Sequence, residues 1–305
     1  MFRRSLLPFG AVAVTVAALA SHASGSTPQL IAFTASADKV ANGFLLVTVT
    51  RAGKDPTLIA PAKGALKVAD FSFTWSPDGH FIAYPCGRGI NDDHRAVCVV
   101  DARSGLNTTL TNSSSVSIEP FAWGRNGWIA SDCNDRDLCL VDSETGRIRF
   151  ITRSPRTALG GYVFGDDLVW SPDGKTLAFG CRKKTQQDRR FCFLEHGKLV
   201  VGNRSWNALR IEGWTPDSKR IVWWGRFGGS DKLAYHEQKI DGSGLEPLPP
   251  TAVVRGPTYS ADGHHRLTSN HGPAGLFDEP VAGGAVRTIV PRSSGVIAWD
   301  YAYQP

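Results

Sequence analysis

Residues 75–79 read WSPDG, and residues 170–174 repeat the same five letters. Three related stretches occur elsewhere: WGRNG from Trp123, WTPDS from Trp214 and YSADG from Tyr259. The five aromatic starts are separated by 48, 47, 44 and 45 residues. A period in the forties, in a chain rich in strand-forming residues, is typical of the blades of a β-propeller.

Each unit follows one plan, which predicts four short antiparallel strands. An apolar stretch such as FSFTW (71–75) leads into the turn, and an apolar run such as TLAFG (176–180) leaves it. A polar loop, a third strand such as VCVVD (97–101) and a short fourth strand such as LNTTLT (106–111) complete the unit. We expect the aromatic residue before each turn to fill the space between neighbouring sheets.

The letters after the aromatic residue are those of a tight turn. Pro77 has φ fixed near the value that the first central position needs, Asp78 can bond the backbone locally, and Gly79 accepts a positive φ. The same residue types recur at 172–174. We therefore interpret these aspartates as turn formers rather than as catalytic groups.

The two ends of the chain fit one shared blade. Residues 295–299, GVIAW, read as a first strand that ends in its aromatic residue, Trp299, without a PDG turn. LIAF (30–33), FLLVTVT (44–50) and PTLIA (56–60) read as second, third and fourth strands that lack a first strand. The sequence thus predicts an all-β fold: six four-stranded blades, closed by pairing of the C-terminal strand with the N-terminal blade. Such closure removes the exposed edge that an open array would leave.

The first 25 residues have the pattern of a cleaved secretory signal peptide. Arg3 and Arg4 precede an apolar run from Leu6 to Ala20, and small residues suited to cleavage follow. An uncleaved membrane anchor is the alternative, although the run is short for a span of about 20 residues. Sec and twin-arginine export both stay open. We therefore expect a signal peptide at 1–25, one propeller domain at 26–305, and a secreted or periplasmic location.

Composition and charge narrow the class of protein. The 305 residues include 32 Gly, 9 Trp and 15 Phe but a single Met, which suits many short strands better than long helices. The formal charge of +6 falls to +4 without the two arginines of the leader. This surplus gives no reason to expect nucleic-acid binding, which calls for a clustered basic face. We expect a monomer that is not an integral membrane protein.

The six cysteines occupy equivalent positions in three consecutive blades. One cysteine ends the second strand and the next begins the third, in the contexts AYPC…VCVV, ASDC…LCLV and AFGC…FCFL. Adjacent antiparallel strands bring such positions within disulfide range, and an exported compartment favours oxidation. A metal site is the alternative, but the chain has no Cys-x-x-Cys pair. We predict three hairpin disulfides: Cys86–Cys98, Cys133–Cys139 and Cys181–Cys192.

The repeated stretches resemble the TolB-like six-bladed β-propellers, whose blades carry a W-S-P-D-G-x-x-[IL]-A-[FY] core. WSPDGHFIAY (75–84) and WSPDGKTLAF (170–179) match this core nearly throughout, whereas WTPDSKRIVW (214–223) has Ser218 in place of Gly. The resemblance covers the propeller part only, and we expect no additional α/β domain ahead of the blades. It implies the fold but no single activity, because such propellers serve in binding proteins, in peptidase lids and in enzymes.

Charged residues on the innermost strands predict a polar mouth of the central channel. By analogy the first strand of each blade is innermost, and the positions four before each aromatic residue are Phe71, Glu119, Asp166, Arg210, Arg255 and Gly295. Such a mouth suits a polar ligand, a peptide terminus or a cation such as Ca²⁺, which binds carboxylate and carbonyl oxygens. The alternative is mutual neutralisation around a water-filled channel. With their charged neighbours, the candidate residues are Glu119, Asp166, Asp167, Arg210, Glu212 and Arg255.

Three charged hairpin tips next to the cysteines predict a second surface, for a protein partner. The tips are GRGINDDHRAV (87–97), NDRDL (134–138) and RKKTQQDRR (182–190). Loops that disulfides stiffen lose less entropy on binding. The alternative is that these loops are merely solvated. The candidate residues are Arg88, Asp92, Asp93, Arg136, Arg182, Lys183, Lys184, Arg189 and Arg190.

No catalytic motif stands out in the chain. It lacks a G-x-S-x-G elbow and a Gly-rich phosphate loop, and HEQKI (236–240) lacks the second His of a zinc-protease helix. We assign no catalytic residue, no metal ligand and no cofactor beyond the Ca²⁺ considered above. The sequence favours an exported, non-catalytic propeller that binds a protein, peptide or envelope ligand through its loop face and channel mouth. The alternative is an exported lactonase-, lyase- or hydrolase-like enzyme that uses channel-mouth carboxylates and a bound cation.

Overall fold

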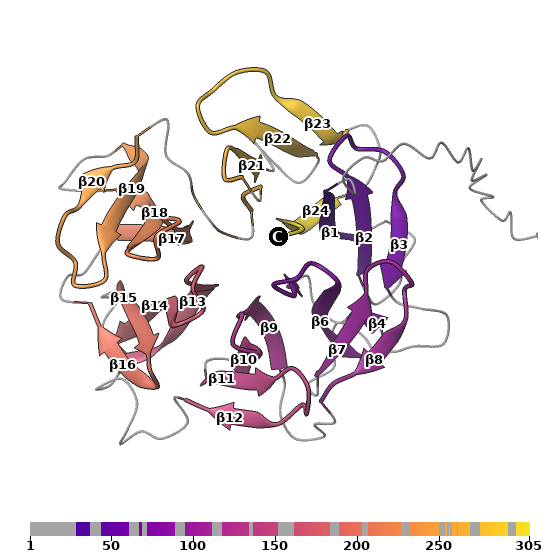
Figure 1. The fold of residues 1–305 in the computed structure, drawn as a ribbon, viewed down its shortest axis with the longest axis horizontal. Coiled ribbons are helices and arrows are strands. Elements are labelled where there is room, and N and C mark those ends of the chain that lie inside the picture. Colours follow the sequence, from indigo (N-terminus) through magenta and orange to yellow (C-terminus); the bar gives the residue numbers. More distant parts are fainter. Residues whose placement is uncertain are drawn as a thin grey trace, which may run out of the picture.

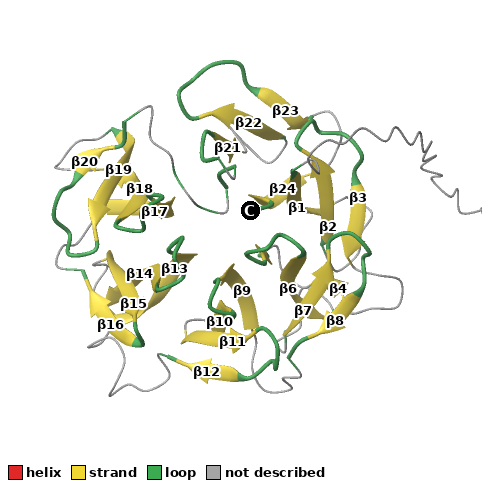
Figure 2. Cartoon of the chain, in the orientation of Figure 1, coloured by secondary structure: helices red, strands yellow, loops and turns green. Residues whose placement is uncertain are grey.

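The chain forms a ring of small twisted sheets around a central axis (Figure 1). Strands and turns make up the described part of this computed structural model, and Figure 2 shows them without a helix. The described residues are 29–36, 44–60, 67–68, 72–88, 95–111, 118–133, 137–151, 162–183, 189–202, 207–226, 232–249, 254, 256, 258–260, 262–268, 275–291 and 297–305.

Six antiparallel blades make the ring, as the period of the repeat predicts. We number them I to VI from the blade that holds the first strand. Blade I consists of β24 (Ile297–Tyr303), β1 (Leu30–Ser36), β2 (Leu45–Thr50) and β3 (Thr57–Ala60). Blade II consists of β4 (Lys67–Val68), β5 (Thr74–Trp75), β6 (Phe81–Gly87), β7 (Ala96–Asp101) and β8 (Asn107–Thr109). Blade III consists of β9 (Ile118–Trp123), β10 (Trp128–Cys133), β11 (Asp137–Asp142) and β12 (Ile148–Phe150).

The second half of the ring repeats the same order. Blade IV consists of β13 (Tyr162–Trp170), β14 (Thr176–Lys183), β15 (Arg189–Glu195) and β16 (Lys198–Val201). Blade V consists of β17 (Asn207–Trp214), β18 (Arg220–Arg226), β19 (Leu233–Lys239) and β20 (Glu246–Pro247). Blade VI consists of β21 (His265–Thr268), β22 (Leu276–Pro280) and β23 (Arg287–Val290).

Blades II and VI depart slightly from four continuous strands. In blade II the short strands β4 and β5 both pair with β6, so together they form its inner edge. In blade VI the inner edge is a bridge between Tyr259 and Arg266, extended by the hydrogen bond from the Leu267 N–H to the Thr258 carbonyl. The innermost position is therefore filled in every blade.

The core consists of six apolar clusters, one between each pair of neighbouring blades. The cluster between blades IV and V is rich in aromatic rings and includes the fully buried Trp214 and Trp223. The cluster between blades V and VI is smaller, with Val222, Val254 and Tyr259 as its buried members. Because each sheet buries both faces against its neighbours, the packing of one blade depends on the two beside it.

The repeated turn is held by the same hydrogen bonds in four blades. In blade II the Ser76 hydroxyl donates to Asp78 Oδ1 at 2.6 Å and accepts the Phe81 N–H at 2.9 Å. The His80 N–H donates to the same carboxylate at 3.0 Å, and Gly79 has a φ of 69°. Equivalent serine- or threonine-to-aspartate bonds occur in blades IV, V and VI. These contacts confirm that the motif aspartates form the turns.

Departures from the turn motif link neighbouring blades. Asn126 stands where other turns have Asp, and its side-chain amide donates to the Gly174 carbonyl of blade IV at 3.0 Å. Ser218 replaces the turn glycine at a φ of 62°, and its hydroxyl accepts the Asp173 N–H at 3.1 Å. Gln304 follows the last strand and donates to the Gly79 carbonyl at 2.7 Å. Each of these side chains thus makes a contact between blades.

The ring closes through β24, which pairs antiparallel with β1. The predicted closure is confirmed, but its register is not the one that the sequence indicates. Tyr303 pairs with Ile31, the relation that Trp75 has to Ile82 in blade II, so Tyr303 and not Trp299 is the aromatic residue before the missing turn. The pairing with β1 continues four residues beyond Trp299, because Phe33 pairs with Tyr301, Ala32 with Ala302 and Ile31 with Tyr303. The inner-strand position assigned to Gly295 accordingly moves to Trp299.

A buried carboxylate joins blade VI to this closing strand. Asp278 of β22 is 1% exposed, and its Oδ1 accepts the Tyr303 hydroxyl of β24 at 2.5 Å. His265 Nδ1 lies 2.9 Å from the same oxygen, and Arg51 Nε of blade I donates to Oδ2 at 3.3 Å. Three side chains from two blades therefore satisfy one buried charge, as burial of a charge requires.

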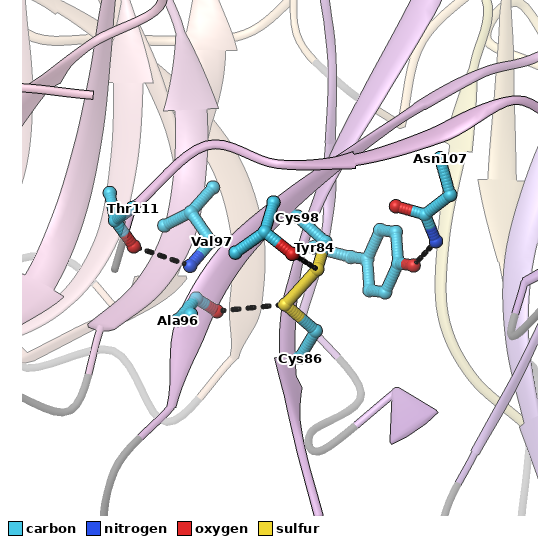
Figure 3. The surroundings of a disulfide bond; sticks show 8 residues. Tyr84, Cys86, Ala96, Val97, Cys98, Asn107 and Thr111 are labelled. Carbon is cyan, nitrogen blue, oxygen red and sulfur yellow. Dashed lines mark hydrogen bonds between the residues drawn. A yellow bond between two sulfur atoms is a disulfide. The ribbon is translucent and has the colours of Figure 1, made fainter. Parts of the chain in front are cut away.

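The three predicted disulfides are present, and each joins the second and third strands of its blade. Their Cα atoms are 5.7, 6.0 and 5.9 Å apart. Figure 3 shows the Cys86–Cys98 bond of blade II, with the hydrogen bond between Tyr84 and Asn107 beside it. In all three blades the paired cysteines sit diagonally across the ladder, because Cys98 lies opposite Tyr84 rather than opposite Cys86. The bonds indicate an oxidising compartment.

No helix in the described ranges is long and apolar enough to span a membrane. The predicted signal peptide at 1–25 lies outside the described residues.

The Asp278 network generates a prediction about ring closure. Asp278→Ala leaves the partly buried Arg51 and His265 and the buried Tyr303 without their acceptor, so we expect a loss of about 3 kcal/mol in the free energy of unfolding. Tyr303→Phe removes one hydrogen bond and should cost about 1 kcal/mol. Urea unfolding of both variants measures these losses. The exposed control Glu144→Ala should stay within about 0.5 kcal/mol of wild type, and equal stability of Asp278→Ala and this control would contradict the role of the network.

Candidate functional site

A cavity of about 760 Å³ opens at the end of the channel where the repeated turns lie. We call it the turn-side mouth. The last residues of the inner strands and the turns that follow them form its wall, so five blades and the C-terminal segment contribute. The aromatic residues in the wall are Trp75, Trp123, Trp170, Tyr259 and Tyr303. The prolines in the wall are Pro77, Pro172, Pro216 and Pro305.

The tryptophans of this wall are held by the preceding blade. Trp75 is 6% exposed, and its indole N–H donates to the Ala302 carbonyl of blade I at 3.4 Å. The ring of Trp170 packs so closely on Gly124 of blade III that a Cβ there would lie 2.9 Å from it. The buried Nε1 of Trp170 has no hydrogen-bond partner among the residues that the structure describes. Trp123 and Trp170 are only half-buried, so both keep some surface toward the mouth.

The polar groups of the mouth come from the turns. Asp173 and Asp217 lie at the rim. Asp173 accepts a hydrogen bond from the Ser171 hydroxyl, and Asp217 accepts one from the Thr215 hydroxyl. These bonds, with the neighbouring backbone N–H groups, lower the pKa of both carboxyls. Both are therefore ionised at neutral pH. Arg125 of blade III occupies the turn position that holds proline in blades II, IV and V.

Three of the six predicted channel residues come together where blades IV and V meet. Asp167, at a φ of 59°, accepts the Ile211 N–H with its carboxylate at 3.0 Å. Arg210 and Glu212 flank that residue, and Arg210 Nε lies 3.3 Å from Glu212 Oε1. The side chain of Arg210 is 44% exposed and that of Glu212 only 9%. Of this pair, Arg210 is the more exposed residue.

Glu212 points toward blade VI and meets a network that the sequence did not reveal. Burial raises the pKa of its carboxyl, while the charges of Arg210 and Arg266 oppose that rise. Arg266 donates to Glu279 at 3.1 Å and lies 4.6 Å from the ring centre of Tyr235. The seam between blades V and VI is therefore polar as well as apolar. The only sequence signal was Arg266 in the place of a usually apolar residue after the turn.

The other predicted channel residues lie wholly or partly outside the described part of the structure. The backbones of Glu119 and Asp166 belong to β9 and β13, but their side chains are outside it, and so is Arg255. The predicted calcium site stays a prediction, because it depends on these carboxylates. Among the described residues, no group of three or more His, Cys, Asp or Glu side chains is placed to hold a metal ion.

Of the candidate residues at the hairpin tips, the structure describes the side chains of two. Arg88 is exposed at the end of β6. Arg190 is half-buried, and one of its terminal nitrogens donates to the Gly202 carbonyl at 3.4 Å. The remaining candidates lie outside the described residues, some with their side chains only: Asp92, Asp93, Arg136, Arg182, Lys183, Lys184 and Arg189.

Comparison with known proteins supports the architecture and leaves the activity open. No protein-family model matches the sequence, and comparison with curated proteins gives no significant match. The structure of TolB from Acinetobacter baumannii is similar at a TM-score of 0.65 and 18% identity, over 91% of this chain and 67% of that one. A putative TolB from Agrobacterium tumefaciens is similar at 0.51 and 16%, over 92% and 100%. An oligogalacturonate lyase in complex with manganese reaches only 0.48 at 13% identity, over 87% and 74%. At such identities the likeness shows the fold alone, and the chain has the fold of a TolB-like propeller.

The buried Glu212 generates a prediction about pH. Its pKa is higher in the folded than in the unfolded protein, so the folded state holds a proton that the unfolded state releases above pH 4.5. Because the folded state binds more protons, the free energy of unfolding falls as the pH rises above 4.5. Glu212→Gln cannot titrate, so its stability relative to wild type should increase as the pH rises above 4.5.

Urea unfolding at several pH values measures this slope. Glu246→Gln, whose parent side chain is 60% exposed, is the control and should give a flat difference. A flat difference for Glu212→Gln as well would contradict the burial of a charge at this seam.

Proposed function

We propose that the protein is a non-catalytic, exported binding protein that takes up a peptide segment of a protein partner at the turn-side mouth. The observation that carries this proposal is the cavity of about 760 Å³ with its wall of aromatic and proline side chains. Ligand sites are concave and mostly apolar, with a few polar groups that fix orientation. The half-buried Trp123 and Trp170 supply the apolar surface, and the turns supply the polar groups.

The backbone of the inner strands supports a peptide as the ligand. β9, β13, β17 and β24 are each the terminal strand of their sheet, so one edge of each has no strand partner among the described residues. An extended peptide can add hydrogen bonds to such an edge, while pockets select its side chains. Aromatic rings also pack well on the flat surfaces of proline and of other aromatic residues.

Export supports a partner outside the cytoplasm. The three disulfides indicate an oxidising compartment, which agrees with the expected signal peptide at 1–25. The charged hairpin tips remain a second predicted surface, which the same partner contacts if it is large enough to reach both ends of the ring. The experiment below therefore separates the two surfaces.

Removal of an aromatic wall residue should weaken peptide binding. A display library of random heptapeptides is selected on the wild-type protein, and enriched peptides are synthesised and measured by fluorescence anisotropy. Trp170→Ala should weaken their binding at least about fivefold, because loss of a stacked ring costs about 1–3 kcal/mol. Trp128→Ala is the matched control, since Trp128 is half-buried against Arg147 and lies outside the cavity wall.

Two outcomes would contradict the proposal. The first is that no peptide is enriched over a blank surface. The second is that enriched peptides bind Trp170→Ala and Trp128→Ala equally well while both variants remain folded. If charge reversal of Lys183, Lys184, Arg189 and Arg190 abolishes binding instead, the binding surface is at the hairpin tips.

A further inference from the structure

One residue at the rim of the turn-side mouth breaks the pattern of the repeat. Pro77, Pro172 and Pro216 occupy the first central position of their turns, and Arg125 occupies that position in blade III. The turn itself is kept, because the Gly127 N–H donates to the Gly124 carbonyl at 3.1 Å and Gly127 has a φ of 78°. The turn therefore gives no reason for an arginine at this position. Its side chain is exposed and lines the cavity.

Arg125 also differs from the other charged groups in the cavity wall. Asp173 accepts hydrogen bonds from Ser171 and from the Lys175 N–H, and the Lys175 ammonium lies 3.8 Å away. Asp217 is held by its own turn through Thr215 and the Lys219 N–H. Arg125 has no hydrogen bond and no ion pair with any residue that the structure describes. All of its donors are thus available to a ligand.

The surroundings of Arg125 define what such a ligand looks like. Trp123 precedes it by two residues, and the Trp170 ring packs on the adjacent Gly124. A guanidinium beside aromatic surface binds an anion whose neighbouring group is apolar or aromatic. Asp173 lines the same cavity, and Gly174, the residue after it, is close to Arg125, since the Arg125 Cβ lies 3.3 Å from the position of a Cβ on Gly174. This carboxylate repels a dianionic phosphate more strongly than it repels a carboxylate that carries one charge.

We infer that Arg125 is a recognition residue for a peptide carboxylate, and that the partner segment places this carboxylate next to an aromatic or apolar side chain in the turn-side mouth. The inference rests on the proposed function and names the chemistry of its ligand. Two sources share this chemistry: the carboxyl terminus of a peptide and the side chain of Asp or Glu. A bidentate contact from a guanidinium to either source accounts for the arginine at a position where three of the other four turns have proline.

The repeat supplies the variant that tests the inference. Arg125→Pro restores the residue of the other turns, removes the charge and keeps the turn, because proline suits this position. Arg125→Gln is a second variant that keeps the backbone N–H, and Arg125→Lys keeps the charge without the bidentate geometry. Arg103→Gln is the matched control, since Arg103 is an exposed residue of the β7–β8 turn that does not line the cavity. Thermal unfolding confirms that each variant is folded.

The random heptapeptide library is selected in parallel on wild type, on Arg125→Pro and on Arg103→Gln. We expect peptides from wild type and Arg103→Gln to be enriched in an acidic group beside an aromatic residue, and those from Arg125→Pro to lose the acidic group. Enriched peptides should bind Arg125→Pro and Arg125→Gln at least about tenfold more weakly than wild type, the size expected for one charge-assisted contact. Added salt should weaken binding to wild type more than to Arg125→Pro.

Synthetic versions of an enriched peptide identify the source of the carboxylate. A peptide amide that loses affinity assigns the carboxyl terminus, and a Glu→Gln or Asp→Asn peptide that loses affinity assigns the side chain. Enrichment without an acidic group, or equal affinity of wild type and Arg125→Pro, would overturn the inference. If the enriched peptides in either of these cases still bind Trp170→Ala more weakly than wild type, the proposed function stands and only the role of Arg125 is lost. Absence of any enriched peptide would overturn both.

Discussion

The pairing of β24 with β1 is the constraint on which the rest of the structure depends. It brings the last strand of the chain to the inner edge of the first blade, so β1 is paired on both sides and blade I reaches four strands. The same pairing carries Tyr303 to the buried Asp278 of blade VI and Gln304 to the turn of blade II. It also places Tyr303 and Pro305 in the wall of the turn-side mouth. The candidate site therefore exists only in the closed ring, because an open array would lose these wall residues and the apolar cluster between blades VI and I.

The turns of the repeat have three functions in this molecule. Within a blade, the hydroxyl and carboxylate of the motif close the turn, and the glycine after them accepts a positive φ. Between blades, the residues that depart from the motif make the contacts, as Asn126 and Ser218 do. Around the channel, the aromatic residues of blades II, III, IV and VI and the turn prolines of blades II, IV and V form part of the wall of the mouth. In blade III, Asn126 makes the contact to the next blade, and Arg125 places at the rim a charge that has no partner among the described residues. The motif has aspartate and proline at these two positions.

The sequence predicted the features that repeat and missed those that depend on contacts between distant residues. The six blades, the direction of closure and the three disulfides follow from position within the period, so they could be read from one chain. The register of the last strand could not, because Trp299 and Tyr303 both follow apolar residues and no turn motif comes after either. The orientation of Glu212 depends on the irregular pairing between Ile211 and Gly213, which no local pattern indicates. The turn residues were recognised as turn formers, but their place around the mouth depends on the packing of neighbouring blades.

Hydrogen exchange of the closing strand tests the central claim most directly. If β24 completes blade I, the amide hydrogens of 297–303 that bond to β1 should exchange only when the whole ring unfolds, with the same opening free energy as those of β6 and β14 in the middle of the chain. Native-state exchange followed by mass spectrometry compares these segments in one sample. Equal protection of all three is the result that a closed ring predicts. Rapid exchange of 297–303, as in a frayed terminus, while β6 and β14 stay protected would contradict it.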